Sequence, residues 1–80
     1  MLSENHFSVL NAIYLKKMVT PATISDMTSL PIEDVIEQIE ESEKLEMLLK
    51  LPDGVMLLTD GTQQVVGYYM QHYVNLRTQA

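Results

Sequence analysis

The stretch from Pro31 to Leu45 constrains the fold most, because its residues alternate with the period of a helix. At about 100° per residue, four branched apolar residues fall on one side of that helix: Ile32, Val35, Ile36 and Ile39. Acidic residues occupy the other side: Glu33, Asp34, Glu37, Glu40 and Glu41. The pattern predicts a helix that packs one face on a core, turns an acidic face outward and ends at about Ser42, because Glu43 would rotate back onto the apolar side.

The acidic residues of this stretch account for the charge of the whole chain. Residues 31 to 46 contain seven acids and one base, a net charge of -6, which equals the formal net charge of all 80 residues. Phosphate backbones and anionic lipids repel such a chain. Nucleic acids and membranes are therefore disfavoured as partners, whereas the acidic face suits water or a basic protein surface.

The chain has the size and composition of one small domain, which we expect to fill residues 1–80. Its 80 residues are near the size at which a single core is only marginally stabilising. It has no cysteine, which excludes disulfides and thiolate metal sites and favours a reducing setting. No apolar run approaches the roughly 20 residues of a membrane span, and no secretory signal pattern is visible. We expect a soluble, cytoplasmic protein.

The first half of the chain predicts two further helices before the acidic one. Ser3 can cap a helix that runs to about Lys17. Its expected inward residues are Phe7, Leu10, Ile13, Tyr14 and Met18. A brief strand at residues 18–20 precedes Thr20-Pro21, which is a strong start for a short helix ending at about Met27, with Ile24 and Met27 inward. The three residues before Pro31 then form a tight turn, which is a helix-turn-helix spacing.

In the second half of the chain, the spacing of apolar residues changes from that of a helix to every second residue, as in a strand, and then returns to that of a helix. Met47, Leu49 and Leu51 share one side of a strand, and either Val55 with Leu57 or Met56 with Leu58 line the returning one. Pro52-Asp53-Gly54 forms the turn of this hairpin. Thr59 is expected to cap a last helix from about Thr62 to Leu76. Along one side of this helix would lie Val65, Tyr69, Tyr73 and Leu76.

This order of elements resembles the winged helix-turn-helix domain of bacterial transcription regulators. The likeness rests on V-T-P-A-T-I-S-D-M, on L-P-I-E-D-V-I-E-Q-I and on L-E-M-L-L-K-L-P-D-G-V-M-L-L-T-D-G. The resemblance implies an α+β domain with three helices, a two- to three-stranded wing and a C-terminal helix. In DNA-binding members of that family, the third helix enters the major groove.

Carried over to this chain, the resemblance assigns a recognition helix and a wing tip. The groove-facing positions would be Ile32, Glu33, Glu37 and Gln38, and the wing tip would comprise Lys50, Pro52, Asp53 and Gly54. The sequence departs from the family at both places, because carboxylates stand where lysine and arginine would contact phosphates. A further departure is Glu43, where members commonly have a glycine that ends the third helix.

The last helix has more apolar surface than one core requires. Its apolar and aromatic side chains cover a wide arc: Val65, Val66, Tyr68, Tyr69, Met70, His72, Tyr73, Val74 and Leu76. We predict a partner interface, either a homodimer or a contact with a neighbouring domain, at Val66, Tyr69, Met70, Tyr73 and Val74. The alternative is that the tyrosines lie flat on the surface with their hydroxyls in water.

No pattern in the sequence indicates catalysis, a cofactor or a metal. A cation site at Glu33, Glu37, Glu40 and Glu41 would lack the additional oxygen ligands that calcium prefers. His6 and His72 are isolated, and the three glycines are too far apart to form a phosphate-binding loop. We therefore predict neither an enzyme nor a binder of a small-molecule substrate.

The first hypothesis is a regulatory module that works through protein–protein contacts. The last helix would pair with a partner, and the acidic helix would face water or a basic surface. The alternative is a small DNA-binding transcription regulator, in which the wing and two lysines, Lys16 and Lys17, contact phosphates.

Overall fold

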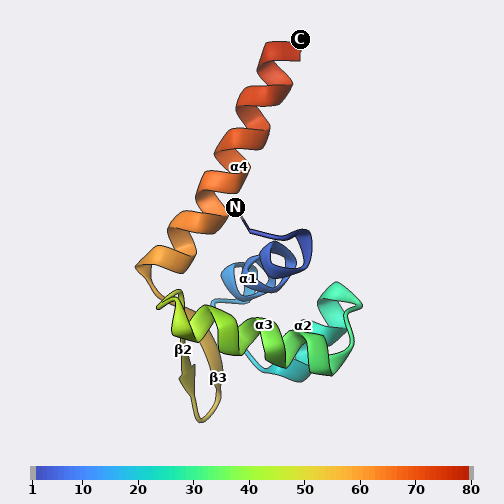
Figure 1. Ribbon diagram of the computed structural model, residues 1–80, viewed down its shortest axis with the longest axis vertical. Helices are drawn as coiled ribbons and strands as arrows, with labels where there is room; N and C mark the ends of the chain where they lie inside the picture. The colour runs from blue at the N-terminus through green and yellow to red at the C-terminus, as the bar shows by residue number, and fades with distance from the viewer. Residues whose placement is uncertain (1, 80) are drawn as a thin grey trace.

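The computed structural model describes the backbone of residues 2–79 and the side chains of residues 2–74. Its elements are α1 (Glu4–Lys16), β1 (Met18–Val19), α2 (Pro21–Thr28), α3 (Ile32–Lys44), β2 (Leu48–Leu51), β3 (Gly54–Leu57) and α4 (Thr59–Gln79). Helices α1, α2 and α3 form the body with the small sheet, and α4 extends well beyond that body (Figure 1). The predicted α+β winged helix-turn-helix architecture is confirmed.

The helix starts follow the capping residues that the sequence predicts. The Ser3 hydroxyl accepts a hydrogen bond from the His6 backbone N–H at 3.1 Å, and the Thr20 hydroxyl accepts one from the Thr23 N–H at 3.3 Å. Proline follows Thr20 in the first turn of α2, where its missing N–H costs no hydrogen bond. These local contacts fix where α1 and α2 begin.

Helix α3 ends at Lys44, two residues beyond the predicted end at Ser42. Ser42 continues the buried side of the helix, and Glu43 points outward, where its carboxylate lies 3.3 Å from Lys50 Nζ. The chain then turns through Glu46, whose φ is 58°, and the Met47 N–H donates to the Ser42 carbonyl at 2.9 Å. This is a Schellman ending with a left-handed residue other than glycine. The left-handed position is therefore Glu46 rather than Glu43.

The sheet places one row of apolar residues inward and another outward. Its strand order is β1-β3-β2, and both pairings are antiparallel. Val19 pairs with Val55 on the inner face, and Met56 pairs with both Met18 and Leu49 on the outer face. Of the two open predictions for β3, Val55 with Leu57 is the one that faces the core. The predicted face of β2 that contains Leu49 and Leu51 is the exposed one, and Leu48 is buried instead.

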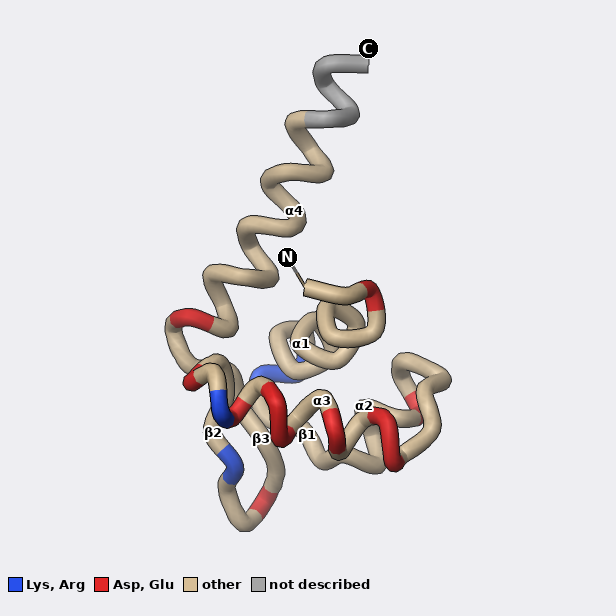
Figure 2. Tube along the Cα trace, viewed as in Figure 1, with Lys and Arg blue, Asp and Glu red and all other residues tan. Residues whose placement is uncertain are grey.

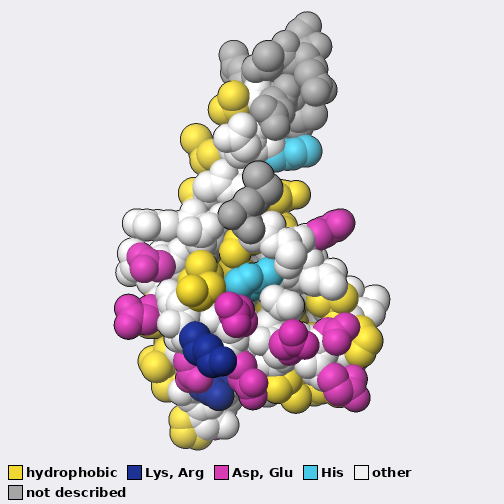
Figure 3. All heavy atoms as spheres, viewed as in Figure 1, with side chains coloured by type: hydrophobic (Ala, Val, Ile, Leu, Met, Phe, Trp, Pro, Cys, Tyr) yellow, Lys and Arg dark blue, Asp and Glu magenta, His cyan; other side chains and the backbone are white. Residues whose placement is uncertain are grey.

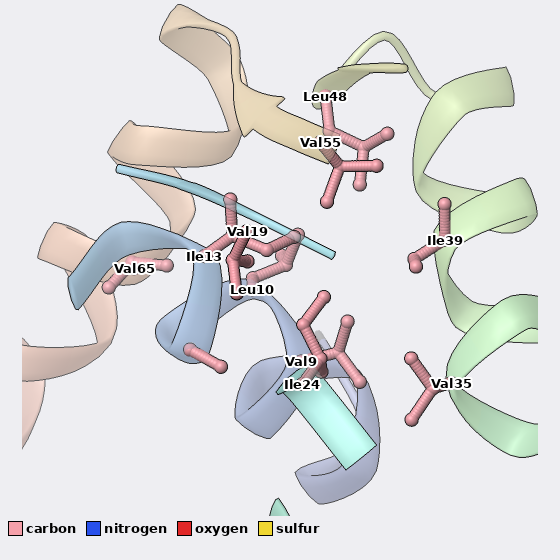
Figure 4. Packing of buried hydrophobic residues seen from close by; sticks show 11 residues of the cluster. Val9, Leu10, Ile13, Val19, Ile24, Val35, Ile39, Leu48, Val55 and Val65 are labelled. Atoms are coloured by element: carbon pink, nitrogen blue, oxygen red, sulfur yellow. The ribbon is translucent and has the colours of Figure 1, made fainter. Parts of the chain in front are cut away.

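The core lies between α1, α2, α3, the sheet and the base of α4 (Figure 4). It consists of Val9, Leu10, Ala12, Ile13, Val19, Ile24, Val35, Ile39, Leu48, Val55 and Val65. The prediction of an inward position is wrong for five residues, which are exposed: Tyr14, Met18, Met27, Ile32 and Ile36. Because the body contacts α3 along one narrow row, only Val35 and Ile39 of its four branched residues are buried.

Helix α4 begins at Thr59, three residues before the predicted start, and extends to Gln79. Its first turn follows β3 directly, because the Thr62 N–H donates to the Leu58 carbonyl at 3.0 Å. Val65 is the residue of α4 that enters the core. The side chain of Leu76, predicted on the same side of the helix as Val65, lies outside the described residues. No helix in the described part of the chain is long and apolar enough to cross a membrane.

Candidate interaction surfaces

The outward face of α3 is a continuous acidic surface. Glu33, Asp34, Glu37, Glu40 and Glu41 are all exposed. Figure 2 shows acidic positions following one another along α3, and Figure 3 shows acidic side chains gathered on this side of the molecule. Within the described residues one ion pair forms, between Lys50 and Glu43, and it leaves these five carboxylates un-neutralised. An exposed pair of this kind contributes little to stability. The acidic face of α3 therefore presents its full charge to solvent.

Of the positions assigned to a recognition helix, Glu33 and Glu37 belong to this face, and Ile32 and Gln38 lie to either side of it. Ile32, Glu33 and Glu37 are exposed, and Gln38 is half-buried. Ile32 is 37% exposed and Ile36 is 44% exposed, one turn apart on the same side of α3. The surface thus combines two apolar side chains with flanking carboxylates, which suits a partner with apolar and basic groups.

The tip of the wing consists of Pro52 and Asp53, which are exposed. Gly54, predicted to belong to the tip, is buried instead. Its φ of 150° and the Val19 carbonyl oxygen, which would lie 2.7 Å from an added Cβ, explain why a glycine is needed there. Lys50 is exposed, but its ammonium is paired with Glu43 of α3. The described wing therefore lacks the positive tip that a phosphate contact would need.

The predicted interface on α4 is divided between the body and the solvent. The Tyr69 hydroxyl donates to Asn11 Oδ1 of α1 at 2.6 Å, and Tyr68 stacks on Phe7 with ring centroids 3.8 Å apart. These contacts hold α4 against α1. Tyr69 therefore stabilises the packing of the two helices, although part of its side chain is exposed. The other predicted interface residues, Val66, Met70, Tyr73 and Val74, are exposed.

Two grooves flank the base of α4. One, of about 480 Å³, lies where α1 ends beside the sheet. It is lined by Ile13, Tyr14, Leu15, Lys17, Met56, Leu57 and Thr62. The other, of about 540 Å³, runs along the opposite flank of α4. It is lined by Leu2, Gln63, Gln64, Gly67, Tyr68, Gln71 and His72. Lys17 is the one charged residue among the linings of these two grooves, so both are largely neutral.

The described residues contain no group of three or more histidine, cysteine, aspartate or glutamate side chains placed to hold a metal ion. The four α3 carboxylates weighed above as a cation site therefore remain an acidic surface without a chelating arrangement.

Three solved structures share this arrangement of elements. A mutant of MepR from Staphylococcus aureus aligns with a TM-score of 0.82 and 14% identity, over 99% of this chain and 66% of that one. RV1404 from Mycobacterium tuberculosis aligns at 0.80 and 13%, over 99% and 60%. MepR, described as a transcription regulator of the S. aureus multidrug efflux pump MepA, aligns at 0.79 and 14%, over 99% and 65%.

The chain is a winged helix-turn-helix domain. At these identities the likeness shows the fold alone, and the domain spans less than two thirds of each of those three chains. No family model and no curated protein matches the sequence.

A buried polar pair joins the first and third helices of this winged-helix domain. His6 Nε2 and Ser42 Oγ lie 2.5 Å apart, and His6 is 7% exposed whereas Ser42 is fully buried. Burial disfavours the charged imidazole and lowers the pKa of His6 below 6.5, while the nearby Glu41 carboxylate partly opposes that shift. No sequence pattern indicates a partner for His6, because Ser42 is 36 residues away along the chain.

The stability of the domain should therefore decrease as the pH falls below about 6.5. Because the folded state holds the His6 proton less tightly than the unfolded state, His6 favours folding fully above pH 6.5. That contribution is lost as the pH falls through the folded pKa. Urea unfolding at pH 7.5 and pH 5.5 measures the change. The variant His6→Gln retains a hydrogen-bonding side chain without titrating, and its change over this interval should be smaller than that of the wild type.

Proposed function

We propose that this winged-helix domain is a non-catalytic regulatory module that works in the cytoplasm through protein–protein contacts. The observation that carries the proposal is the exposed acidic face of α3, the helix to which the resemblance assigns the recognition role. In this proposal the acidic face meets a basic protein surface. Helix α4 pairs with a second copy or with a neighbouring domain.

The charge of α3 supports a protein partner over a phosphate backbone. DNA binding gains much of its affinity when lysine and arginine release counterions from phosphates, and five exposed carboxylates offer the opposite charge. A basic protein surface would instead be attracted and oriented by the same field. Ile32 and Ile36 would supply the apolar contacts that a purely electrostatic encounter lacks.

The second candidate is a small DNA-binding transcription regulator. The fold likeness to MepR, which is described as a transcription regulator, favours this candidate over the first. In this proposal Lys16 and Lys17, both exposed at the end of α1, contact phosphates together with the wing. The charge of α3 and the fold likeness thus favour different candidates, and a binding measurement separates them.

A fluorescence anisotropy titration of mixed-sequence DNA at low salt tests both candidates. We expect no binding at protein concentrations below about 100 μM, because that is the weak end of ordinary non-specific DNA binding. Binding that is detectable at low salt and weakens steeply as salt rises would overturn the first candidate in favour of the second.

A further inference from the structure

The outer face of the sheet carries apolar residues where a sheet exposed to water normally carries polar ones. The inner face is apolar as well, and Figure 4 shows Val19, Leu48 and Val55 in the core. An antiparallel sheet with one face in water usually alternates apolar and polar residues along each strand. Five side chains share the outer face, each between 37% and 47% exposed: Met18, Leu49, Leu51, Met56 and Leu58. A sheet that is apolar on both faces is typical of one that is covered on both.

The outer face continues into the groove at the end of α1. Met56 lies at its centre, because it pairs with Met18 on one side and with Leu49 on the other. Met56 also lines the groove of about 480 Å³, together with Tyr14 and Leu15, which are 40% and 61% exposed. Sheet and groove thus form one apolar surface. A surface of this kind on a small domain marks a contact site.

The dimensions of the outer face match those of a single helix. Strands β2 and β3 have four residues each, which corresponds to a length of about 13 Å. The three strands lie side by side, so the sheet is about 10 Å wide from its first to its last strand. A helix with its side chains is about 10–12 Å wide, and roughly nine residues rise 13 Å. One amphipathic helix therefore suffices to cover the face.

The charges beside this surface indicate which kind of helix fits. Lys16 and Lys17 are exposed where α1 ends, and neither takes part in an ion pair among the described residues. Lys17 lines the groove beside Met56. Of the acidic residues nearest in the sequence, Asp53 lies in the turn of the hairpin and Asp60 in the first turn of α4. Carboxylates of a partner are therefore complementary to the edge of the face where α1 ends.

We propose that the outer face of the sheet docks an amphipathic helix of another protein, whose apolar side covers Met18, Leu49 and Met56. Acidic residues on one flank of that helix meet Lys16 and Lys17. Neither the acidic face of α3 nor the predicted interface on α4 belongs to this surface. The inference therefore does not depend on either contact of the proposed function, and it can fail or succeed by itself.

A synthetic peptide tests this surface. The probe is a fluorescent helix of about 14 residues, or four turns, with leucine along one side, glutamate along one flank and alanine elsewhere. We expect a Kd of about 10–100 μM, as for a small contact. Met56→Gln should weaken binding by about tenfold, because Met56 is at the centre of the surface.

Ile32→Gln is the matched control for Met56→Gln. Ile32 is also 37% exposed, but it lies on α3 outside the proposed surface. With both variants shown to be folded by circular dichroism, Ile32→Gln should leave the Kd unchanged. A wild-type chain that does not bind the peptide, or equal weakening by the two variants, overturns the inference.

The acidic flank of the partner is tested by two lysine variants. Lys17→Gln and Lys44→Gln each change the formal net charge from -6 to -7, but of these two lysines only Lys17 lines the groove. Lys17→Gln should weaken peptide binding by about two- to fivefold, the size of an exposed ion pair. Lys44→Gln should leave it unchanged. Equal effects of the two variants would mean that the net charge alone acts on the peptide, which overturns the assigned flank.

Two further measurements distinguish other occupants of the surface. Displacement of the peptide by mixed-sequence DNA would assign Lys16 and Lys17 to phosphate contacts and overturn the inference. A wild-type dimer that Met56→Gln converts to monomers in light scattering would mean that a second copy covers the face, which also overturns it. DNA that binds without displacing the peptide would instead overturn the first candidate function and leave this surface as proposed.

Discussion

Replacing Gly61 with alanine should strongly destabilise the domain. A Cβ at this position would overlap the carbonyl oxygen of Met47 and lie 3.0 Å from the carbonyl carbon of the same residue. It would also lie 3.2 Å from Leu57 Cδ2. A flexible side chain can move aside, but the Met47 carbonyl belongs to the backbone that leads into β2. The first turn of α4 must therefore move away from the sheet.

The Met47 carbonyl cannot shift cheaply, because it already accepts the Leu58 N–H at 2.9 Å. Moving α4 instead would withdraw Val65 from the core and separate Tyr68 from Phe7. We expect a loss of about 3 kcal/mol or more in the free energy of unfolding. That is a large part of the roughly 4–12 kcal/mol that a domain of this size has in total.

Urea unfolding followed by far-ultraviolet circular dichroism measures this loss. Gly67→Ala is the matched control, because it makes the same chemical change on the same helix without meeting any atom. It should raise the free energy of unfolding of the monomer by about 1 kcal/mol. Equal stability of Gly61→Ala and the wild type would mean that α4 does not pack on the Met47 carbonyl as the structure shows.

The order of elements could be predicted because its determinants are local. Ser3 and Thr20 cap the helices that follow them, and the apolar period changes where α3 gives way to β2. Periodicity shows which residues share a side of an element, but it does not show how wide an arc the neighbouring elements cover. The four branched residues of α3 therefore formed one predicted stripe, of which only Val35 and Ile39 are buried.

The sheet and the glycines show what local patterns cannot decide. Both faces of β3 are apolar, so the sequence left Val55 and Met56 as equal choices for the core. Gly61 and Gly67 lie six residues apart on the same helix, yet a Cβ at Gly61 would meet the Met47 backbone and a Cβ at Gly67 would meet nothing within 4 Å. The pairing of His6 with Ser42 likewise depends on how α1 and α3 pack, which spacing along the chain does not report.

Replacing Glu33 and Glu37 with lysine should give the domain measurable affinity for DNA. Both positions are exposed on α3, where the resemblance to winged-helix regulators places the groove contacts. The two substitutions change the formal charge of the chain from -6 to -2 and put two lysines on the face that carried five carboxylates. We expect non-specific binding with a Kd of about 10–100 μM at low salt, at least about tenfold tighter than the wild type. The logarithm of the binding constant should fall with the logarithm of the salt concentration with a slope of roughly -1.8, if both lysines contact phosphates.

A second double variant, Glu4→Lys with Asp60→Lys, separates the position of the charge from its amount. Both residues are exposed outside α3, so this variant has the same net charge of -2 and an unchanged acidic helix. Anisotropy titrations of the two variants on the same DNA, after circular dichroism has shown both to be folded, make the comparison. Tight binding by the α3 variant alone would mean that the fold retains a DNA-binding geometry that its own carboxylates block. Equal binding by both variants would mean that net charge decides the affinity for DNA. It would also mean that α3 does not contact the DNA groove in preference to other surfaces of the domain. In the first case the acidic face itself directs this winged helix away from nucleic acid and toward a basic protein surface.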